Sequence, residues 1–317
     1  MNIVQIMRTA LRALTVNKMR SILTMLGVII GVTSVVSLMS IGYGVQNSIT
    51  SNFESMGTNL LYVTGGATST SGVMSAMGST STLTLADADA IAGLSTVKAV
   101  APQVSTREQV VAGKNNSNTQ IYGVTDEYAS VRNYEIKEGD FISTDEVDSK
   151  SLVAVLGNDT ATTLFGDTDP IGQTIKINSI QFKVIGVLAA KGSSGMGSQD
   201  DMIIVPITTA MARLTSSRST TGLKYVSTIY VQMVSSGQTD ASITQITTLL
   251  EDRHNIDTEA GKTDDFTITS QQATIDSLKS STSVLVLFLG AIAGITLLVG
   301  GTLAQDYWVL RQLAHEE

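Results

Sequence analysis

Two uncharged apolar segments near the ends of the chain dominate its pattern of hydrophobic and polar positions. The first, Ser21–Tyr43, contains no charge and no proline, and the second, Val284–Ala304, lies within the uncharged segment Ser280–Gln305. Each is long enough to cross a bilayer as one helix, which needs about 20 apolar residues. We therefore predict transmembrane helices at 21–43 and 280–305, so that the lipid bilayer is the first expected partner.

Basic residues before the first segment predict the orientation of the chain. Arg8, Arg12, Lys18 and Arg20 precede it, and no acidic residue occurs before Glu54. Because positive charge stays on the cytoplasmic side, both termini are expected in the cytoplasm and the middle region outside it, in the cytoplasmic (inner) membrane. A cleaved signal peptide is disfavoured, since the apolar run exceeds the usual length of about 7–15 residues and no A-x-A site follows.

The chain next to the first segment is expected to be helical on both sides of the membrane. Residues 1–20 place apolar side chains at helical spacing among basic ones, which predicts an amphipathic helix along the inner membrane face. A frayed tail is the alternative. Residues 44–57 repeat apolar positions at Val45, Ile49 and Phe53, so the first helix should continue as a stalk that ends at Gly57.

Small residues recur at four-residue spacing within both segments. Gly27 and Gly31 form a G-x-x-x-G motif that Ser34 extends by one turn, and Gly290 and Gly294 repeat the motif in the second segment. Small residues allow helix backbones to approach closely in lipid. We predict that these five residues pack helices together, although glycine is also simply common in membrane helices.

The middle region alternates between strand and helix patterns. Residues 58–139 predict a strand, a loop, a short helix that begins at Thr84 with Asp87 as its capping partner, and two strands joined by a turn at 114–118. The strands and the loop are Asn59–Gly65, Ala67–Ser81, Val97–Ala112 and Thr119–Val124. This part is expected to be the first half of one subdomain.

A change of pattern near Asp140 predicts an inserted, mostly β subdomain at 140–221, before the first subdomain resumes at 222–279. The insertion should contain a strand, a helix, a hairpin that turns at Asn178–Ser179, a strand and a helix: Leu152–Leu156, Asn158–Phe165, Ile175–Val184, Met202–Val205 and Thr208–Leu214. In the resumed first subdomain the sequence predicts a strand at Tyr225–Val234, a helix at Ser242–Arg253 and a strand at Phe266–Thr269. The predicted fold class is a membrane protein with two transmembrane helices that flank an α+β extracytoplasmic domain.

The charge balance argues against a nucleic-acid-binding protein, and the absence of cysteine excludes a disulfide-stabilised fold. The chain has a net charge of −8, and residues 54–279 hold 25 acidic and 15 basic residues without a basic run. Nucleic acid is therefore not an expected partner. With 0 cysteines, a disulfide framework is excluded.

Residues suited to catalysis are few. The chain has only 2 histidines, His254 and His315, both expected to be solvated, so neither a metal cluster nor a histidine triad is predicted. Ala260–Thr263 resembles the end of a phosphate-binding loop, but Ile256 stands where Walker A spacing requires glycine. The pairs Asp200–Asp201 and Asp264–Asp265 lack the spacing of a calcium loop and are interpreted as solvated loop ends. We expect no enzyme activity, no metal and no cofactor.

Segments in all parts of the chain resemble one known family. They are Leu11–Leu14, Asn17–Val32, Leu156–Gly192, Gln199–Pro206 and Ala291–Gly301. The pattern of Gly166, Asp169–Pro170 and Gly172 is quite specific. The family-signature structural positions are Gly157, Phe165, Gly166, Asp169, Pro170, Gly172 and Gly186. Together these segments resemble the MacB-like ABC transporter permeases of the MacB/FtsX superfamily.

The resemblance implies a porter-like subdomain with an inserted second subdomain, and a permease that works with an ABC ATPase subunit. It also implies a dimer, either a homodimer or a heterodimer with another permease, and an extracytoplasmic adaptor. In such a complex, ATP-driven closure of the helices moves the outer domains for efflux of peptides, antibiotics or lipid-linked substrates. The alternative is a membrane-anchored regulator or scaffold that signals to extracytoplasmic partners such as cell-wall hydrolases. An anchored enzyme is a third, weaker interpretation.

The C-terminal segment departs from the family pattern. Members continue past the second helix into a cytoplasmic loop and two further spans, whereas residues 306–317 form a short acidic tail that is expected to be cytoplasmic. A truncated or split gene, or a frameshifted end, is the expected explanation. The chain alone would then not couple to ATP hydrolysis.

Overall fold

The structure is a computed structural model that describes Gln5 and residues 18–55, 59–66, 69–70, 73–74, 82–194, 197–215, 225–256 and 264–313. The chain divides into two compact units. Met1–Ser51 and Ile275–Glu317 form the first, here called the helical unit, and Asn52–Thr274 form the second, here called the sheet domain.

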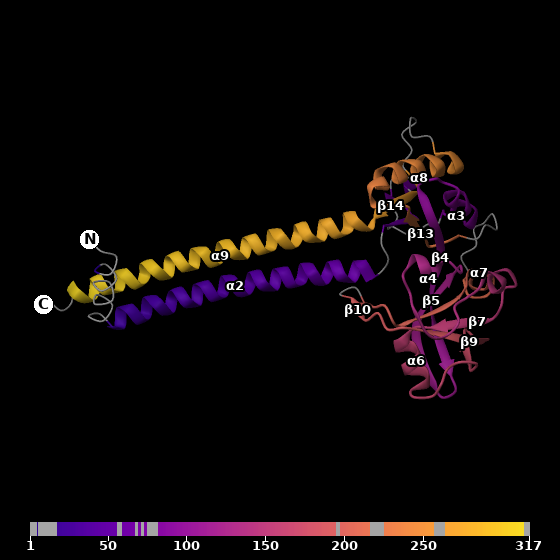
Figure 1. Cartoon of the computed structure of the whole chain (residues 1–317), viewed down its shortest axis with the longest axis horizontal. Helices are drawn as coiled ribbons and strands as arrows, with labels where there is room; N and C mark the ends of the chain where they lie inside the picture. Colours follow the sequence, from indigo (N-terminus) through magenta and orange to yellow (C-terminus); the bar gives the residue numbers. More distant parts are fainter. Residues whose placement is uncertain are drawn as a thin grey trace. The chain divides into compact units, whose positions relative to one another are not determined.

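Two long helices, α2 (Lys18–Ser55) and α9 (Gln271–Leu313), make up the described part of the helical unit and run side by side (Figure 1). The prediction that the first apolar helix continues past Tyr43 is confirmed, because α2 has no break before Ser55. Gly57, the predicted end of the stalk, and most of the predicted helix at 1–20 lie outside the described residues.

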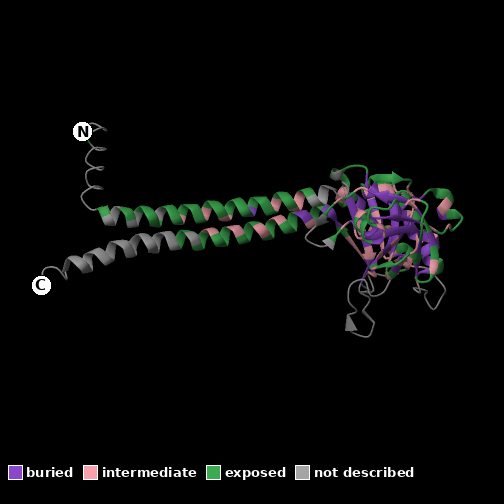
Figure 2. Ribbon diagram, turned by 90° about the horizontal axis from the view of Figure 1, so that it is seen from below, coloured by how far each residue is buried: buried purple, intermediate pink, exposed green. Residues whose placement is uncertain are grey.

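Large apolar side chains on these helices face outward. Leu287 is 76% exposed and Phe288 is 62% exposed, and Figure 2 shows exposed residues along much of α2. By length and composition, Met25–Ser51 and Gln271–Ile292 can each cross a membrane, with mean hydropathies of 2.1 and 1.4. An apolar surface of this kind is costly in water, so lipid is its natural solvent.

The sheet domain contains six further α-helices and a 3-10 turn among its described residues: α3 (Leu85–Ala92), α4 (Tyr128–Val131), α5 (Thr144–Asp148), α6 (Asn158–Phe165), α7 (Ile207–Arg213), α8 (Thr239–His254) and η1 (Ser236–Gln238). The strands of its main sheet are β1 (Leu60–Gly65), β4 (Val97–Ala112), β5 (Asn115–Val124), β6 (Ile136–Gly139), β7 (Val153–Leu156), β8 (Thr174–Ile177), β9 (Ile180–Leu188), β12 (Met202–Pro206), β13 (Thr228–Met233) and β14 (Phe266–Ser270). Two small hairpins, β2 (Ser69–Thr70) with β3 (Val73–Met74) and β10 (Ser193–Ser194) with β11 (Gly197–Ser198), are separate from it.

The main sheet has ten strands in the order β14-β1-β13-β4-β5-β12-β7-β9-β6, and β8 pairs with both β4 and β9. Only the β12–β5 and β7–β9 pairs are parallel. The other pairs are antiparallel, which agrees with strands that alternate buried and half-buried positions, such as β13.

Six of these strands close a ring, because β4, β5, β12, β7, β9 and β8 each pair with the next and β8 returns to β4. One hydrophobic core belongs to this ring, and its members Ile121, Phe182 and Ile203 are fully buried. The ring needs β4 and β5, which precede residue 140, so the segment 140–221 shares its core with the preceding chain. The predicted subdomain boundaries at 140 and 221 stay a prediction.

A second core contains residues of β1, β4 and β13 together with side chains of α3, α4 and α8. Leu61, Ile91 and Ile246 are fully buried in it. The capping box that the sequence predicts for α3 is present, since Thr84 accepts from Asp87 N–H and Asp87 accepts from Thr84 N–H. This core therefore fixes α3 and α8 beside the strands β1 and β14.

Most predicted elements are confirmed, including α6 at Asn158–Phe165 and the turn at Asn178–Ser179, where both residues have positive φ. The turn predicted at 114–118 was wrong: β5 begins at Asn115, and the reversal is made by Gly113, with φ +58, and Lys114. The asparagines at 115, 116 and 118 pair with β4 instead, because tertiary pairing overrides their turn preference. Helices α4 and α5 and strand β6 were not predicted.

Candidate functional site

The two strands that connect to the candidate spans are neighbours in the sheet. β1 lies between β13 and β14, and the β1–β14 pair runs antiparallel from Leu61 opposite Ser270 to Gly65 opposite Phe266. β1 follows α2 in the chain, and β14 is followed directly by α9 at Gln271. The strands that adjoin the two long helices in the chain are therefore hydrogen-bonded neighbours in the sheet.

Asp265, immediately before β14, fastens this edge strand to the rest of the sheet domain. Its carbonyl oxygen accepts hydrogen bonds from Gly66 N–H at 2.7 Å and from the Thr82 hydroxyl at 2.8 Å. Its carboxylate Oδ1 lies 2.7 Å from Nδ1 of His254 at the end of α8. Backbone and side chain of one residue thus tie β14 to three separate segments.

Asp265 also belongs to an ionic cluster that connects α8 with α3. Its members are Asp87, Arg253, His254 and Asp265. Asp87 is 3% exposed, and its Oδ1 accepts from Arg253 Nε at 2.6 Å, while its Oδ2 lies 3.3 Å from His254 Nε2. The prediction that His254 is solvated was wrong, because its side chain is only 11% exposed and lies between two carboxylates. His315 lies outside the described residues.

The cluster shifts the protonation of its own members. Hydrogen bonds with Asp265 and then Asp87 raise the pKa of His254 to about 9, against the smaller opposing effect of burial. Burial opposes ionisation of Asp87, but hydrogen bonds from His254, Arg253 and Thr84 outweigh it and hold the pKa of this carboxyl well below its usual range. At neutral pH the cluster is therefore a charged network of a protonated histidine, an arginine and carboxylates.

Within the helical unit, α2 and α9 make a polar and a close apolar contact. Gln46 Nε2 donates to Ser283 Oγ at 3.0 Å. Gly42 is buried, and a Cβ built on it would meet a methyl group of Val286 and lie 3.6 Å from Val286 Cβ. The helices can approach this closely only because position 42 has no side chain.

The predicted packing glycines lie elsewhere on these helices. A Cβ added at Gly27, Gly290 or Gly294 would meet no atom of the described chain within 4 Å, and Ser34 donates its hydroxyl to Ile30 O within its own helix. Gly31 is half-buried. Packing by these five residues, for example against a second chain, stays a prediction. Sequence reasoning missed Gly42 because it is not part of a four-residue repeat.

The signature positions lie on and around α6 and the β8–β9 hairpin. A Cβ at Gly157, the N-cap of α6, would meet the backbone of Asp200, and one at Gly186 would meet the carbonyl of Asp140. Gly166 and Gly172 have φ of +60 and +78. Phe165 is half-buried and packs on the ring core, Pro170 is buried, and Asp169 Oδ1 accepts from Ile171 N–H at 2.8 Å. Gly157 and Gly166 thus lie at the two ends of α6, and a signature role for the seven residues stays a prediction.

The acidic pair at 200 and 201 was also predicted wrongly as a solvated loop end. Asp200 is 4% exposed, and its two carboxylate oxygens accept the N–H groups of Lys191 and Gly192, each at 2.8 Å. Asp201 Oδ1 accepts from the hydroxyls of Thr119 and Thr160. Both carboxylates hold loop and strand together, because a buried charge must be hydrogen-bonded.

The described residues include no group of three or more His, Cys, Asp or Glu side chains that could hold a metal ion. The geometry consists of two long apolar helices, a pair of adjacent strands, and an ionic cluster that binds the edge strand. A family described as "MacB-like periplasmic core domain" matches residues 21–249.

The chain belongs to this MacB-like family. It is 36% identical over 301 residues to the "Macrolide export ATP-binding/permease protein MacB" of Azoarcus sp. (strain BH72), covering 95% of this chain and 43% of that protein. It is 37% identical over 285 residues to the protein of the same name from Chlorobium luteolum, covering 90% and 42%. The chain thus spans less than half of the length of these curated relatives.

Solved structures agree on the fold. The periplasmic region of MacB from Actinobacillus actinomycetemcomitans superposes with a TM-score of 0.58 at 23% identity, over 73% of this chain and 97% of that one. The extracellular domain of the noncanonic ABC-type transporter YknZ from Gram-positive bacteria gives 0.51 at 18% identity, over 67% and 100%. The MacB-like chain therefore combines a periplasmic-type core domain with two helices long and apolar enough to span a membrane.

Proposed function

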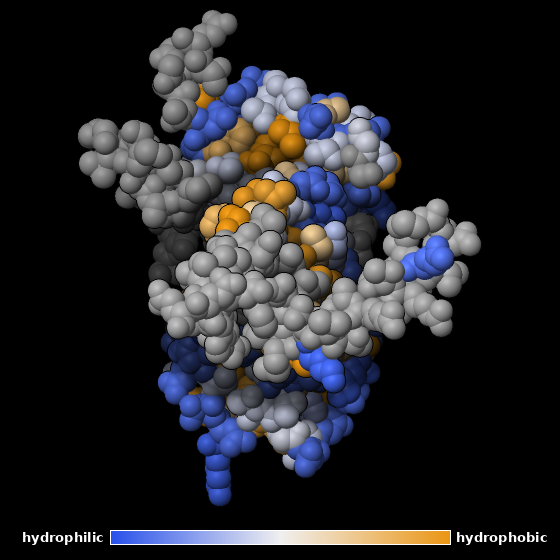
Figure 3. All heavy atoms as spheres, turned by 90° about the vertical axis from the view of Figure 1, so that its left-hand side faces the viewer, coloured by the Kyte–Doolittle hydropathy of each residue, from blue (hydrophilic) through white to orange (hydrophobic). Residues whose placement is uncertain are grey.

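We propose that this MacB-like chain is the permease subunit of an ABC-type exporter or mechanotransmission complex. In this role the chain anchors in the cytoplasmic membrane with both termini in the cytoplasm, and the sheet domain is extracytoplasmic. The basic residues before the first span support this orientation. Figure 3 shows hydrophilic residues gathered over the lower part of the face in view, as an aqueous location of that part requires.

One observation carries the proposal: β1 and β14 are adjacent in the sheet, β1 is the first strand after α2 in the chain, and β14 is followed directly by α9. A hydrogen-bonded strand pair is stiff along its length, so relative movement of the helices becomes strain or movement in the sheet domain. The ionic cluster passes that movement from β14 to α3 and α8 rather than letting the edge strand detach.

The energy source in this proposal is an ABC ATPase that acts with the permease. The names of the curated relatives combine an ATP-binding and a permease function. Assembly as a homodimer, or as a heterodimer with another permease, pairs the helical units, and an extracytoplasmic adaptor receives the movement of the sheet domain. The substrates are peptides, antibiotics or lipid-linked molecules, and macrolides are the first to test because the relatives' names specify them.

Affinity capture of the tagged chain from native membranes tests the proposal, with a full-length permease as the positive control. We expect an ABC ATPase to co-purify, and deletion of the chain to lower macrolide export. A membrane regulator would instead leave export unchanged and alter cell-wall cleavage. Capture without any ATPase, together with unchanged export, would contradict the proposed function.

A further inference from the structure

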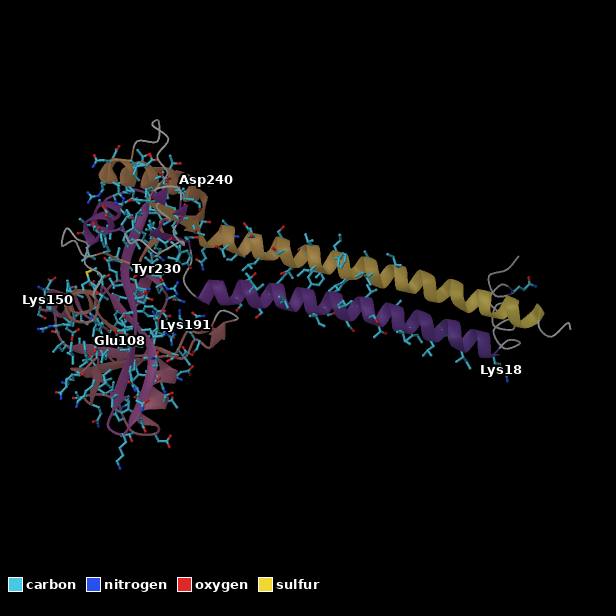
Figure 4. All side chains as sticks on the ribbon, turned by 180° about the vertical axis from the view of Figure 1, so that it is seen from behind. Lys18, Glu108, Lys150, Lys191, Tyr230 and Asp240 are labelled. Atoms are coloured by element: carbon cyan, nitrogen blue, oxygen red, sulfur yellow. The ribbon has the colours of Figure 1, made fainter. Side chains whose placement is uncertain are left out.

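A pocket of about 110 Å³ lies in the sheet domain, and its lining includes none of the four residues of the ionic cluster. Its lining includes four tyrosines, Arg132 and Gln199. Tyr122 lies on β5, Tyr128 on α4 and Tyr230 on β13, and Tyr134 lies between α4 and β6. Their rings pack on one another: Tyr128 stacks on Tyr134 with centroids 6.0 Å apart and meets Tyr230 edge-on at 5.8 Å. Tyr230 and the nearby Lys191 are labelled in Figure 4.

Arg132 is the main charge in this pocket. It caps the C-terminus of α4 and is only 9% exposed, with its guanidinium carbon 4.7 Å from the centre of the Tyr230 ring. Tyr62 and Tyr134 hydrogen-bond to it through their side chains, but its Nε has no hydrogen-bond partner. A buried charged donor without a partner is costly, which points to a ligand that supplies an acceptor.

The side chains that pack on or hydrogen-bond to the Arg132 guanidinium are tyrosines. Burial raises the pKa of Tyr122 to about 12, and it also raises the pKa values of Tyr62, Tyr128 and Tyr134. In the described part of the chain, the ion pairs all involve Arg253 or His254, and none involves Arg132. The positive charge of Arg132 is therefore not neutralised by a contacting carboxylate.

One carboxylate, Asp201, lines the pocket, and both it and the neighbouring Asp200 accept hydrogen bonds from groups other than Arg132. Both oxygens of Asp200 accept N–H groups of the loop at 191–192, and Asp201 accepts two threonine hydroxyls through Oδ1. A second cation reinforces Arg132, since Lys191 Nζ lies 4.0 Å from the centre of the Tyr134 ring and donates to Arg132 O at 2.8 Å. Arg132 and Lys191 therefore place two positive charges against the one carboxylate of the lining, Asp201, so the Arg132 side of the pocket favours an anionic group.

Gln199 supplies a second unsatisfied group. Its Oε1 is buried without a hydrogen-bond partner. The oxygen and nitrogen of a glutamine amide are interchangeable by a flip of the side chain, so this amide can donate to an anion as readily as it accepts from a donor. Arg132 and Gln199 together therefore offer donors to two oxygens of one planar group.

We propose that this pocket binds a carboxylate group carried on a short chain, with Arg132 Nε and the Gln199 amide as donors and the tyrosine rings around its carbon atoms. A carboxylate suits an arginine better than other anions of this size, because the two planar groups match in geometry and charge. The volume of about 110 Å³ compares with a cavity of roughly 150 Å³ that holds benzene, so the group that enters has only a few carbon atoms. This binding does not require that the helices transmit movement, so either proposal can fail without the other.

Two pairs of small probes test the pocket on the full chain in nanodiscs, by ligand-observed NMR titration. Butyrate is compared with butyramide, and N-acetylglycine, which mimics a peptide C-terminus, with N-acetylglycinamide. We expect at least one acid to bind at least tenfold more tightly than its amide. Tighter binding of N-acetylglycine would assign the carboxylate to a peptide, and tighter binding of butyrate to a free acid. Equal affinity of both acids and their amides would overturn the proposal.

Matched arginine variants place the binding in the pocket. Arg132→Gln should weaken acid binding at least tenfold, whereas Arg107→Gln should leave it unchanged, because Arg107 is exposed on β4 and bonds to Asn118. Circular dichroism and thermal melting establish whether each variant is folded. Unchanged acid binding in folded Arg132→Gln would also overturn the proposal. The comparison of acid with amide needs no variant, so it decides the question even if Arg132→Gln does not fold.

Discussion

Gly42 of α2 and Val286 of α9 face each other so closely that a Cβ at position 42 would lie 3.6 Å from Cβ of Val286. This separation is within the range of roughly 3.5–4.5 Å that disulfide-bonded residues adopt. The chain has 0 cysteines, so a pair of introduced cysteines has no competitors within the polypeptide. The two helices can therefore be joined and released at one chosen point.

The first prediction concerns the contact between Gly42 and Val286. Gly42→Cys with Val286→Cys should form an intrachain disulfide under mild oxidation, measured as protection from a maleimide reagent that reductant reverses. Gly44→Cys with Val286→Cys is the matched control, because a Cβ at Gly44 would meet no atom within 4 Å. Equal protection of the two pairs would contradict the helix contact in the structure.

The second prediction concerns the ionic cluster. The folded pKa of His254, about 9, lies above its unfolded value of about 6.5. The stability that its protonated form contributes is therefore complete below pH ~6.5 and is lost as the pH rises through 9. Over that range we expect the sheet domain to lose on the order of 2–3 kcal/mol of its free energy of unfolding.

His254→Gln should remove most of this pH dependence, whereas His315→Gln, which changes the other histidine of the chain, should retain it. Thermal melting of the full chain in detergent at pH 6, 7.5 and 9 measures the effect. If the stability of His254→Gln changed with pH as steeply as that of the wild type, the protonated His254 would not stabilise the cluster that holds β14.

The third prediction concerns Asp200. Asp200→Asn leaves the amide oxygen to accept only one of the N–H groups of Lys191 and Gly192, and the other N–H then faces the amide NH2 group. We expect a loss of about 1–3 kcal/mol in the free energy of unfolding and faster hydrogen exchange of these two amides. Asp167→Asn is the control, because Asp167 is exposed on the turn after α6. Similar exchange in the two variants would argue against the buried role of Asp200.

The fourth prediction concerns the signature glycines. Gly186→Ala places a methyl group against the carbonyl of Asp140, whereas Gly237→Ala places one where no atom lies within 4 Å. Overpacking against backbone costs about 1–3 kcal/mol. Urea unfolding should therefore show a clear loss of stability for Gly186→Ala and little change for Gly237→Ala. Equal unfolding midpoints would mean that this signature position has no packing role.

Local pattern alone was enough to predict the long helices and most of the sheet. Ser21–Tyr43 lacks charge, and Ile175 to Val184 alternates around Asn178–Ser179, so period and turn chemistry agree with the structure there. The helix α6 was also predicted, because Gly166 ends it with a positive φ.

Contacts between distant segments could not be predicted in this way. His254 meets Asp87 across more than 160 positions, and the tyrosines around Arg132 come from four stretches of chain. The sequence around each of these residues carries no pattern that predicts burial. Their burial and their charge pairs therefore follow only from the folded structure. The same holds for the ring of strands, whose closure depends on the pairing of β8 with β4.

The most direct test of the central claim is export by the Gly42→Cys, Val286→Cys chain in cells that contain the proposed ATPase partner. If relative movement of α2 and α9 drives the sheet domain, the oxidised pair should stop macrolide export and reductant should restore it. The Gly44→Cys, Val286→Cys control should export normally under both conditions. Export at the wild-type rate with the disulfide fully formed would contradict the account.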